Sequence, residues 1–543
     1  MLEAESGACR KRGGRLSVCL VYPNHYSVGM SNLGFQTVYA RFNSHPDVAC
    51  DRAFLPDPDE LEEYRKSRTP LLSLETQRPL ADFDVIAFSV SFESDYVNIP
   101  GIFALSGIPS LAGERGESAP LVMGGGAAMF LNPEPVADFL DLVAVGEAEP
   151  LLPSLLHLLL DGAKDRSELL KAAAHLPGIY VPSLYRLTYD GPVLVTREAL
   201  HGAPDVVERQ WDRTVDENPT VSVIMSPGTE FSDMHLVEVS RGCPRGCRFC
   251  AAGFIYAPYR QRSLESVKVQ AERGVQLQGK VGLVGAAVGD FRGIGELSRH
   301  ILEKGGKVSV SSLRIDSLDD EMIDVLIASG HKTVALAPEG GSQRLRDLVG
   351  KNISREQILG ACELLVRKDI LNLKLYFIIG LPTETMADLE EMISLVAAVR
   401  EQVVASARKN KRLGEIILSV NPFVPKPFTP FQWCGMEDLK SLEKKVRFLQ
   451  SAVRPLSNVR MHVESLKEAY LQALVSRGDR RLGQFLVGVW ELGNARKAAA
   501  ASRLDTDLLV NRTIPLHESL PWSIIGGAAA DRLVQEYRKA FSQ

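Results

Sequence analysis

Apolar runs alternate with amphipathic stretches along the first third of the chain. Residues 16–22 and 85–90 are short, β-branched runs, the pattern of buried strands. Between them, Ser31 or Asn32 is placed to cap a helix. The apolar residues of that helix recur at helical spacing: Phe35, Val38, Tyr39 and Phe42. This order of elements predicts strands separated by helices, and therefore a parallel sheet.

Two further apolar runs of this region end in glycine-containing loops. Residues 121–123 lead into Gly124-Gly125-Gly126, and residues 142–145 lead into Gly146-Glu147-Ala148-Glu149. Parallel sheets bind ligands at the carboxyl ends of their strands, where these loops are expected. The triplet is not a G-x-G-x-x-G fingerprint, which counts against NAD, and a tight turn without a ligand explains it equally well.

A second series of alternating runs begins near residue 236. Its predicted strands are 236–240, 281–285, 308–313, 333–337, 371–379 and 415–420. Helical patterns fill the gaps, among them 318–329, 354–368 with Ser354 as N-cap, and 385–404. Six such units predict a partial (β/α)6 barrel, in which chemistry belongs on the loops after the strands.

The pattern divides the α/β chain into four parts. Residues 1–165 are expected to form a Rossmann-like sheet, and 166–235 a connector with a small hairpin. The barrel is expected over 236–430, and a helical C-terminal region over 431–543.

Composition limits the classes of partner. The net charge of −5 over 543 residues counts against a general polyanion-binding surface, although a local basic patch stays open. Five arginines of the C-terminal region either face RNA or form a solvated surface: Arg454, Arg460, Arg477, Arg480 and Arg481. No apolar run approaches the ~20 residues of a membrane span, and no secretory signal is visible. With eight cysteines and no disulfide framework, a reducing cytoplasm is the expected location.

Three cysteines follow the first barrel strand in the spacing C-x3-C-x2-C. Cys243, Cys247 and Cys250 lie within eight residues. Structural zinc usually takes four ligands in two pairs, and a redox dithiol needs only two cysteines. An iron–sulfur cubane held by three thiolates leaves one iron open for another ligand. The spacing therefore favours an iron–sulfur cluster over the other two sites.

This motif, with Phe249 just before the third cysteine, resembles the radical S-adenosylmethionine (SAM) enzymes. The resemblance implies a [4Fe-4S] cluster whose open iron chelates SAM, and a 5′-deoxyadenosyl radical formed by one-electron reduction. It also implies a reducing donor of the flavodoxin or ferredoxin type.

Later rim loops resemble SAM-binding segments of the same family. Gly285 and Ala286 stand where the family has Gly-Gly-Glu, without the glutamate. The segment containing Ser312 and Arg314 resembles one that reaches the SAM carboxylate or ribose. Alternatively, Arg314 forms an ordinary ion pair at the rim. Glu339 resembles a ribose-binding residue or, alternatively, a helix N-terminal carboxylate. Gly380 and Pro382 resemble a segment beside adenine, with Thr383 in place of a glycine.

The N-terminal part resembles, more loosely, the cobalamin (B12)-binding-like domain that precedes the barrel in one radical SAM branch. The Asp-x-His-x-x-Gly motif that supplies a cobalt ligand elsewhere is absent, and His25 has the wrong spacing. Either cobalamin binds without a protein imidazole, or the domain keeps the fold without the cofactor.

The resemblance implies a radical SAM enzyme, most simply a transferase such as a methyltransferase, with an unidentified substrate. One alternative is a methylthiotransferase-like enzyme that modifies RNA or protein without cobalamin. Another is a non-catalytic iron–sulfur partner protein.

Overall fold

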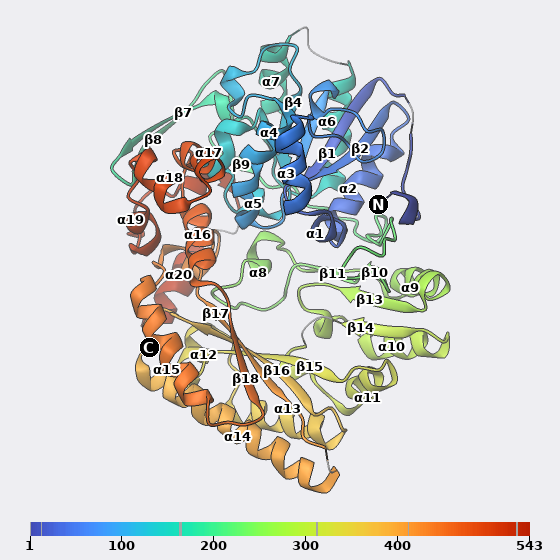
Figure 1. Cartoon of the computed structure of the whole chain (residues 1–543), viewed down its shortest axis with the longest axis vertical. Helices are drawn as coiled ribbons and strands as arrows, with labels where there is room; N and C mark the ends of the chain where they lie inside the picture. Colours follow the sequence, from blue (N-terminus) through green and yellow to red (C-terminus); the bar gives the residue numbers. More distant parts are fainter. Residues whose placement is uncertain are drawn as a thin grey trace.

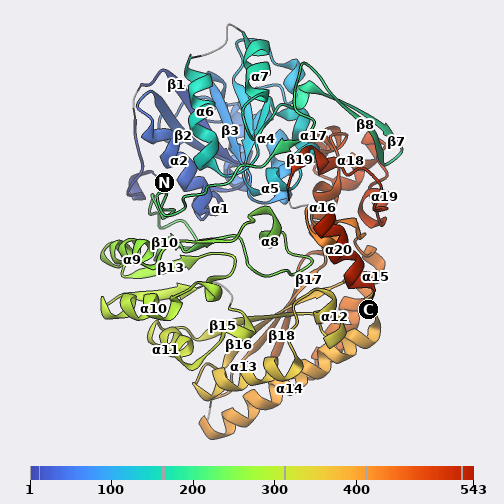
Figure 2. The same cartoon turned by 180° about the vertical axis from the view of Figure 1, so that it is seen from behind.

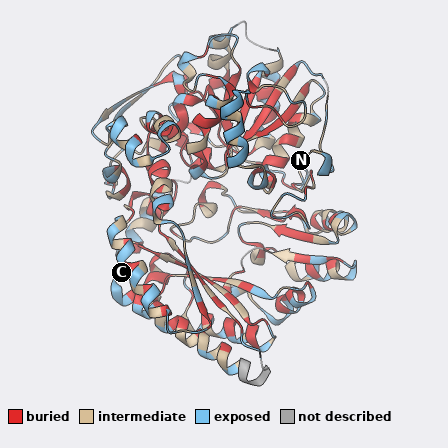
Figure 3. Ribbon diagram, in the orientation of Figure 1, coloured by how far each residue is buried: buried red, intermediate tan, exposed pale blue. Residues whose placement is uncertain are grey.

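Two α/β units lie one above the other, with the C-terminal helices along one side of both (Figures 1 and 2). This computed structural model describes residues 2–11, 13–161, 165–310, 313–410, 412–527 and 530–542. Buried residues concentrate on the strands of both units (Figure 3). The α/β fold class predicted from the sequence is confirmed.

The N-terminal unit is a six-stranded sheet in the order β2-β1-β3-β4-β5-β6. Its strands are β1 (Leu16–Tyr22), β2 (Val48–Phe54), β3 (Val85–Ser89), β4 (Leu121–Gly125), β5 (Leu142–Ala144) and β6 (Ile179–Tyr180). Its helices are α1 (Tyr26–Met30), α2 (Leu33–Ser44), α3 (Pro58–Ser67), α4 (Ile99–Ser106), α5 (Ala127–Leu131), α6 (Ala148–Asp161) and α7 (Arg166–Ala174). Strands β1 to β5 run parallel and only β6 is antiparallel, as ligand-binding sheets of this type require.

The second unit is a partial barrel of parallel strands. One sheet contains β10 (His235–Glu238), β13 (Lys280–Val284) and β14 (Lys307–Val310). The other contains β15 (Thr333–Glu339), β16 (Asn372–Ile379), β17 (Ile416–Pro422) and β18 (Val459–Val463). A bridge between Leu313 and Leu336 joins the two sheets. The last strand, β18, lies beyond residue 430, where the sequence pattern had ended the barrel.

Helices cover the outside of this barrel. They are α9 (Leu264–Gln278), α10 (Ile294–Glu303), α11 (Asp320–Ala328), α12 (Gln343–Leu348), α13 (Arg355–Arg367), α14 (Met386–Asn410) and α15 (Leu439–Val453). Ser354 caps α13 through a capping box, and Asn32 caps α2 by accepting from the Phe35 amide at 2.9 Å. Both caps confirm the helix starts predicted from the sequence.

The connector contains the predicted hairpin and a strap along the first unit. The hairpin is β7 (Tyr185–Asp190) and β8 (Val193–Ala199), and β9 (Val207–Glu208) pairs with β19 (Ile525–Gly526). Gly146 and Gln210 form a further bridge, so the strap runs along the carboxyl edge of the N-terminal sheet.

The C-terminal region joins the two units. Its helices are α16 (Leu466–Arg477), α17 (Leu482–Leu492), α18 (Ala495–Ser502), α19 (Thr506–Asn511) and α20 (Ala530–Phe541). Arg480 pairs with buried Glu134 of the first unit at 3.0 Å and donates to the Tyr180 hydroxyl. Buried Arg477 donates to the Val510 and Arg512 carbonyls. For these two arginines, both the RNA-facing and the solvated interpretations are wrong, whereas Arg460 is 80% exposed.

Within the described ranges, no helix has both the length and the apolarity needed to cross a membrane.

Candidate active site between the two units

The cysteine loop leaves the first barrel strand through a short ribbon. Strand β11 (Ser240–Arg241) pairs with β12 (Arg260–Gln261), and α8 (Ala252–Ile255) follows the cysteines. Gly242 has a φ of +81°, and a Cβ there would stand 2.6 Å from the Tyr256 carbonyl oxygen. Only glycine therefore fits this turn into the loop.

The three thiols are close enough to affect one another. Burial, with smaller contributions from the neighbouring Cys247 and Cys243, raises the pKa of the Cys250 thiol to about 11. Burial also raises the pKa of Cys243, which the Arg245 backbone N–H opposes. Asp290 raises the pKa of Cys243, and Glu339 that of Cys250. The loop after β13 and the carboxyl end of β15 therefore lie near the cysteines.

Two arginines tie the loop to neighbouring elements. Arg245 pairs with Asp290, with one contact at 3.0 Å, and lies 3.6 Å from Asp316. Buried Arg248 donates to the Leu348 carbonyl at the end of α12, at 2.8 Å, and pairs with Glu536 of α20 at 3.1 Å. These contacts hold the cysteines in place without using the thiols themselves.

The donor set fits a multi-iron cluster. Among the residues that the structure describes, no three His, Cys, Asp or Glu side chains converge as around one metal ion. A cubane, in contrast, takes each thiolate on a different iron, so its ligands need not converge on one point. Cys243, Cys247 and Cys250 are free thiols of intermediate exposure on one fixed loop, which suits this arrangement.

The other predicted site residues differ in their surroundings. Gly285 and Ala286 line a chamber described below. Arg314 forms a two-point ion pair with Asp316 at 2.8 and 3.0 Å, the alternative considered from the sequence, although it also lies near Cys247. Ser312 lies outside the described residues.

Glu339, Gly380, Pro382 and Phe249 do not line that chamber. Glu339 has a φ of +66° and pairs with Lys351 at 3.1 Å, and α12 begins four residues later, at Gln343. Gly380 has a φ of +73° and donates its N–H to Glu384 at 2.7 Å; Pro382 follows in the same turn. Phe249 packs behind the cysteine loop in an apolar cluster with Leu345 and Phe431.

A chamber of about 710 Å³ extends from the start of the cysteine loop into the N-terminal unit. Gly285, Ala286 and Val310 line its barrel side. Both predicted glycine loops, Gly124–Gly126 and Gly146–Glu149, contribute residues to its wall, as expected at the carboxyl edge of the sheet.

Inside the N-terminal unit the chamber becomes a slot between sheet and helices. Leu20, Ala87 and Met123 are register neighbours on β1, β3 and β4 and form the sheet wall with Ala144. The helical wall comes from α2 and α6: Val38, Phe42, Leu151 and Leu152. Small side chains at two sheet positions leave room for a flat group to enter this slot.

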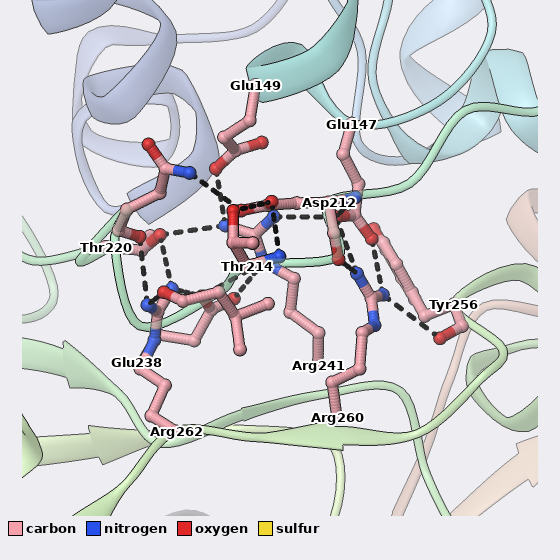
Figure 4. A network of polar contacts seen from close by, with 12 residues as sticks. Glu147, Glu149, Asp212, Thr214, Thr220, Glu238, Arg241, Tyr256, Arg260 and Arg262 are labelled. Carbon is pink, nitrogen blue, oxygen red and sulfur yellow. Dashed lines mark hydrogen bonds and ion pairs between the residues drawn. The ribbon is translucent and has the colours of Figure 1, made fainter.

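A buried ion-pair network joins the N-terminal loop to the cysteine loop (Figure 4). Arg241 contacts Glu147 at 2.8 Å, Glu149 at 2.7 Å and Glu238 at 3.0 Å. Burial raises the pKa of Glu149, but hydrogen bonding from Arg241 outweighs it and lowers that pKa. Glu149 therefore stays charged, and it is paired with an arginine that lies two residues before the first cysteine.

Two further arginines complete the network, Arg260 on β12 and Arg262 directly after it. Arg260 contacts Glu147 at 2.6 Å, and Arg262 contacts Glu238 at 2.5 Å. Both guanidinium groups also bind the strap, at the Asp212 carbonyl and the Thr220 hydroxyl. Sequence reasoning missed this network. The available signal was the alternation of acids at 147 and 149 and of arginines at 260 and 262, but alternation does not identify the partners.

Two family models match the chain. Residues 34–182 match the model of radical SAM proteins, N-terminal, and residues 237–396 match the radical SAM superfamily model. The uncharacterized protein MJ0966 of Methanocaldococcus jannaschii is 29% identical, over 87% of this chain and 90% of that relative. A tRNA-2-methylthio-N(6)-dimethylallyladenosine synthase of Cereibacter sphaeroides is 28% identical, over 45% of this chain and 58% of the relative.

Among solved structures, the chain resembles the radical SAM methyltransferase TsrM from Kitasatospora setae, with cobalamin and a [4Fe-4S] cluster bound. The TM-score is 0.52 at 15% identity, covering 90% of this chain and 100% of that one. This likeness concerns the fold.

Proposed function

Because this chain belongs to the radical SAM superfamily, we propose that it is a cobalamin-binding radical SAM transferase. In this proposal Cys243, Cys247 and Cys250 hold the [4Fe-4S] cluster, and SAM lies between the cluster and Gly285–Ala286. The chemistry that these groups supply when bound is reductive cleavage of SAM and transfer of a methyl group. The protein binds, orients and shields them from water.

The chamber carries this proposal. It is continuous from the cysteine loop to the slot between sheet and helices, so one large ligand can reach from the SAM side into the N-terminal unit. The slot walls at Leu20, Ala87 and Ala144 suit a flat, apolar group at one end of a ligand. The glycine loops let a bulky ring of the same ligand approach the backbone. Cobalamin contains both a flat, apolar group and a bulky ring.

Cobalt coordination in this proposal uses no protein imidazole. Within the described residues, no histidine lines the chamber, and His25 instead pairs with Asp57 at 3.0 Å. Of the two alternatives left open by the sequence, binding without a protein imidazole is the one that agrees with the size of the chamber.

Methyl transfer is favoured over methylthio transfer to RNA or protein because the large apolar chamber offers room for cobalamin, which that alternative does not use. We place the enzyme in a reducing cytoplasm with a flavodoxin- or ferredoxin-type donor. A non-catalytic partner protein would not need the chamber either.

The cluster is tested by anaerobic reconstitution of the full chain. We expect about 4 Fe per chain and a reducible cluster signal, both lost when Cys243, Cys247 or Cys250 is changed to Ala. Cys50→Ala is the matched control, because Cys50 is a buried cysteine on β2, in the N-terminal unit. One zinc per chain and no iron would contradict the cluster.

Cobalamin binding is tested by filling the slot. Ala87→Leu places a larger side chain into the chamber, and we expect it to weaken cob(III)alamin binding at least ten-fold, measured by absorbance after gel filtration. Iron content should not change, because Ala87 lies in the other unit. Ala87→Ser, which adds one oxygen, should bind nearly as the wild type. Wild-type protein that takes up iron but no cobalamin would favour the methylthiotransferase-like alternative.

A further inference from the structure

The Arg241 side chain spans the boundary between the two units (Figure 4). All of its guanidinium nitrogens are engaged: Nε by Glu238 at 3.0 Å, Nη1 by Glu147 at 2.8 Å and Nη2 by Glu149 at 2.7 Å. Arg241 belongs to β11, two residues before the first cysteine, whereas Glu147 and Glu149 follow β5 of the N-terminal unit. One side chain that is 9% exposed therefore connects the cysteine loop to the opposite wall of the chamber.

Glu147 is held as firmly as Arg241. Its two carboxylate oxygens accept four hydrogen bonds of 2.6 to 2.9 Å, one from Arg241, two from Arg260 and one from the Asp212 backbone N–H. The Glu147 backbone N–H in turn donates to the Gln210 carbonyl at 3.0 Å. A displacement of this acid would therefore disturb contacts to the barrel and to the strap at the same time.

The network is more directional than the joining of two units requires. An apolar contact, Phe130 of α5 against Tyr256 of the cysteine loop with 6.1 Å between ring centroids, already crosses the same boundary. Replacing buried ion pairs by apolar residues is often neutral for stability. A guanidinium differs because its planar fork fixes the directions of the carboxylates that it binds. The network therefore defines an orientation between the units as well as an attachment.

We propose that Arg241 and Glu147 are positioning residues that set the separation between a cofactor in the N-terminal unit and the iron–sulfur cluster. This inference rests on the proposed function, because it needs cobalamin in the chamber and a cluster on the cysteine loop. Two peptide units join Arg241 to Cys243, so their Cα atoms are no more than about 8 Å apart. A shift of the guanidinium is therefore passed on to the first cluster ligand.

The test measures this separation directly, without turnover. The full chain, loaded with oxidised cluster and cob(II)alamin, is frozen and cryoreduced, so that the cluster and the cobalt each carry an unpaired electron. Their dipolar splitting in the electron paramagnetic resonance spectrum falls with the cube of the separation. Glu147→Gln and Arg241→Lys should load iron and cobalamin as the wild type does. We expect each to shift or spread the separation by about 1 Å or more, a misplacement that costs oriented reactions roughly 100-fold in rate.

A double variant shows whether both residues act through the same contact. Glu147→Gln combined with Arg241→Lys should change the splitting no more than the larger of the two single changes, because the residues contact each other directly. Should Arg241→Lys lose its iron, Glu147→Gln decides alone, because Glu147 belongs to the other unit.

Arg166→Gln is the matched control. It removes an arginine from another buried pair of the N-terminal unit, 2.6 Å from Asp141 at the amino end of β5, and should leave the splitting unchanged. If Glu147→Gln also keeps the wild-type splitting, the inference is overturned and the proposed function stands. If the wild type takes up iron and binds no cobalamin, both are overturned.

Discussion

At the scale of single residues, Thr383 has a strained backbone conformation. Thr383 occupies the position at which the SAM-binding segment that it resembles has a glycine. Its φ is +65°. This left-handed conformation costs a non-glycine residue about 1–2 kcal/mol. Arg344 braces it by donating to the Thr383 hydroxyl at 2.9 Å and to its carbonyl at 3.0 Å. The substitution is thus accommodated by a specific side chain.

His235 predicts how stability depends on pH. Its ring is 1% exposed, both nitrogens are without partners among the described residues, and burial lowers its pKa from 6.5 to about 4. Between pH 6.5 and 4 the unfolded chain binds a proton at His235 and the folded chain does not. The free energy of unfolding therefore decreases as the pH falls from 6.5 toward 4. At pH 5 the loss attributable to His235 is about 2 kcal/mol.

The measurement compares denaturant unfolding of the wild type and of His235→Leu at pH 7 and pH 5. The variant should lose less stability over this interval, by about 2 kcal/mol. His157→Leu, at a histidine that is 80% exposed, should keep the wild-type pH dependence. Equal slopes for wild type and His235→Leu would contradict the prediction.

At the scale of elements, hydrophobic periodicity predicted the helices and strands that bury one apolar face. Helices α2 and α13 and the barrel strands were predicted from such patterns. Strand β2 was missed because its sequence, Val-Ala-Cys-Asp-Arg-Ala-Phe, contains two charges. Arg52 is fully buried there, 2.6 Å from both Glu5 and Glu75. A charged residue in a strand looks exposed until its partners, distant in sequence, are known.

Strand β18 was missed for the opposite reason. Its side chains alternate between the sheet and solvent, as at an edge, so Val459, Met461 and Val463 are too few to stand out from the helical patterns beside them.

The candidate site also has parts that the sequence predicted and parts that it did not. The cysteine spacing predicted the loop, and the glycine turns predicted the chamber edge. The Arg241 network depends on contacts between the two units, which spacing alone does not specify.

At the scale of the whole molecule, Arg480 tests how the C-terminal helices are attached. Its partner Glu134 has a side chain only 2% exposed, so Arg480→Met leaves a buried carboxylate without a cation. Removing one partner of such a pair costs about 3–5 kcal/mol. We expect faster proteolysis within α16 and α17, measured by limited digestion and mass spectrometry.

Two further variants control this experiment. Arg460→Met removes an arginine that is 80% exposed and should leave the digestion rate unchanged. Adding Glu134→Gln to Arg480→Met removes the stranded charge and should restore part of the resistance. Unchanged digestion of Arg480→Met would show that the helices are held by apolar packing alone.

The pairing of Arg480 with Glu134 also has a consequence for synthesis. The two residues are 346 positions apart, so a ribosome adding about 5–20 residues per second makes the arginine roughly 20–70 s after the glutamate. During that time the newly made N-terminal unit presents Glu134 and Tyr180 without their cation, and the slot without the barrel that closes it. The contact between the N-terminal unit and the C-terminal helices can therefore form only after most of the chain has been made.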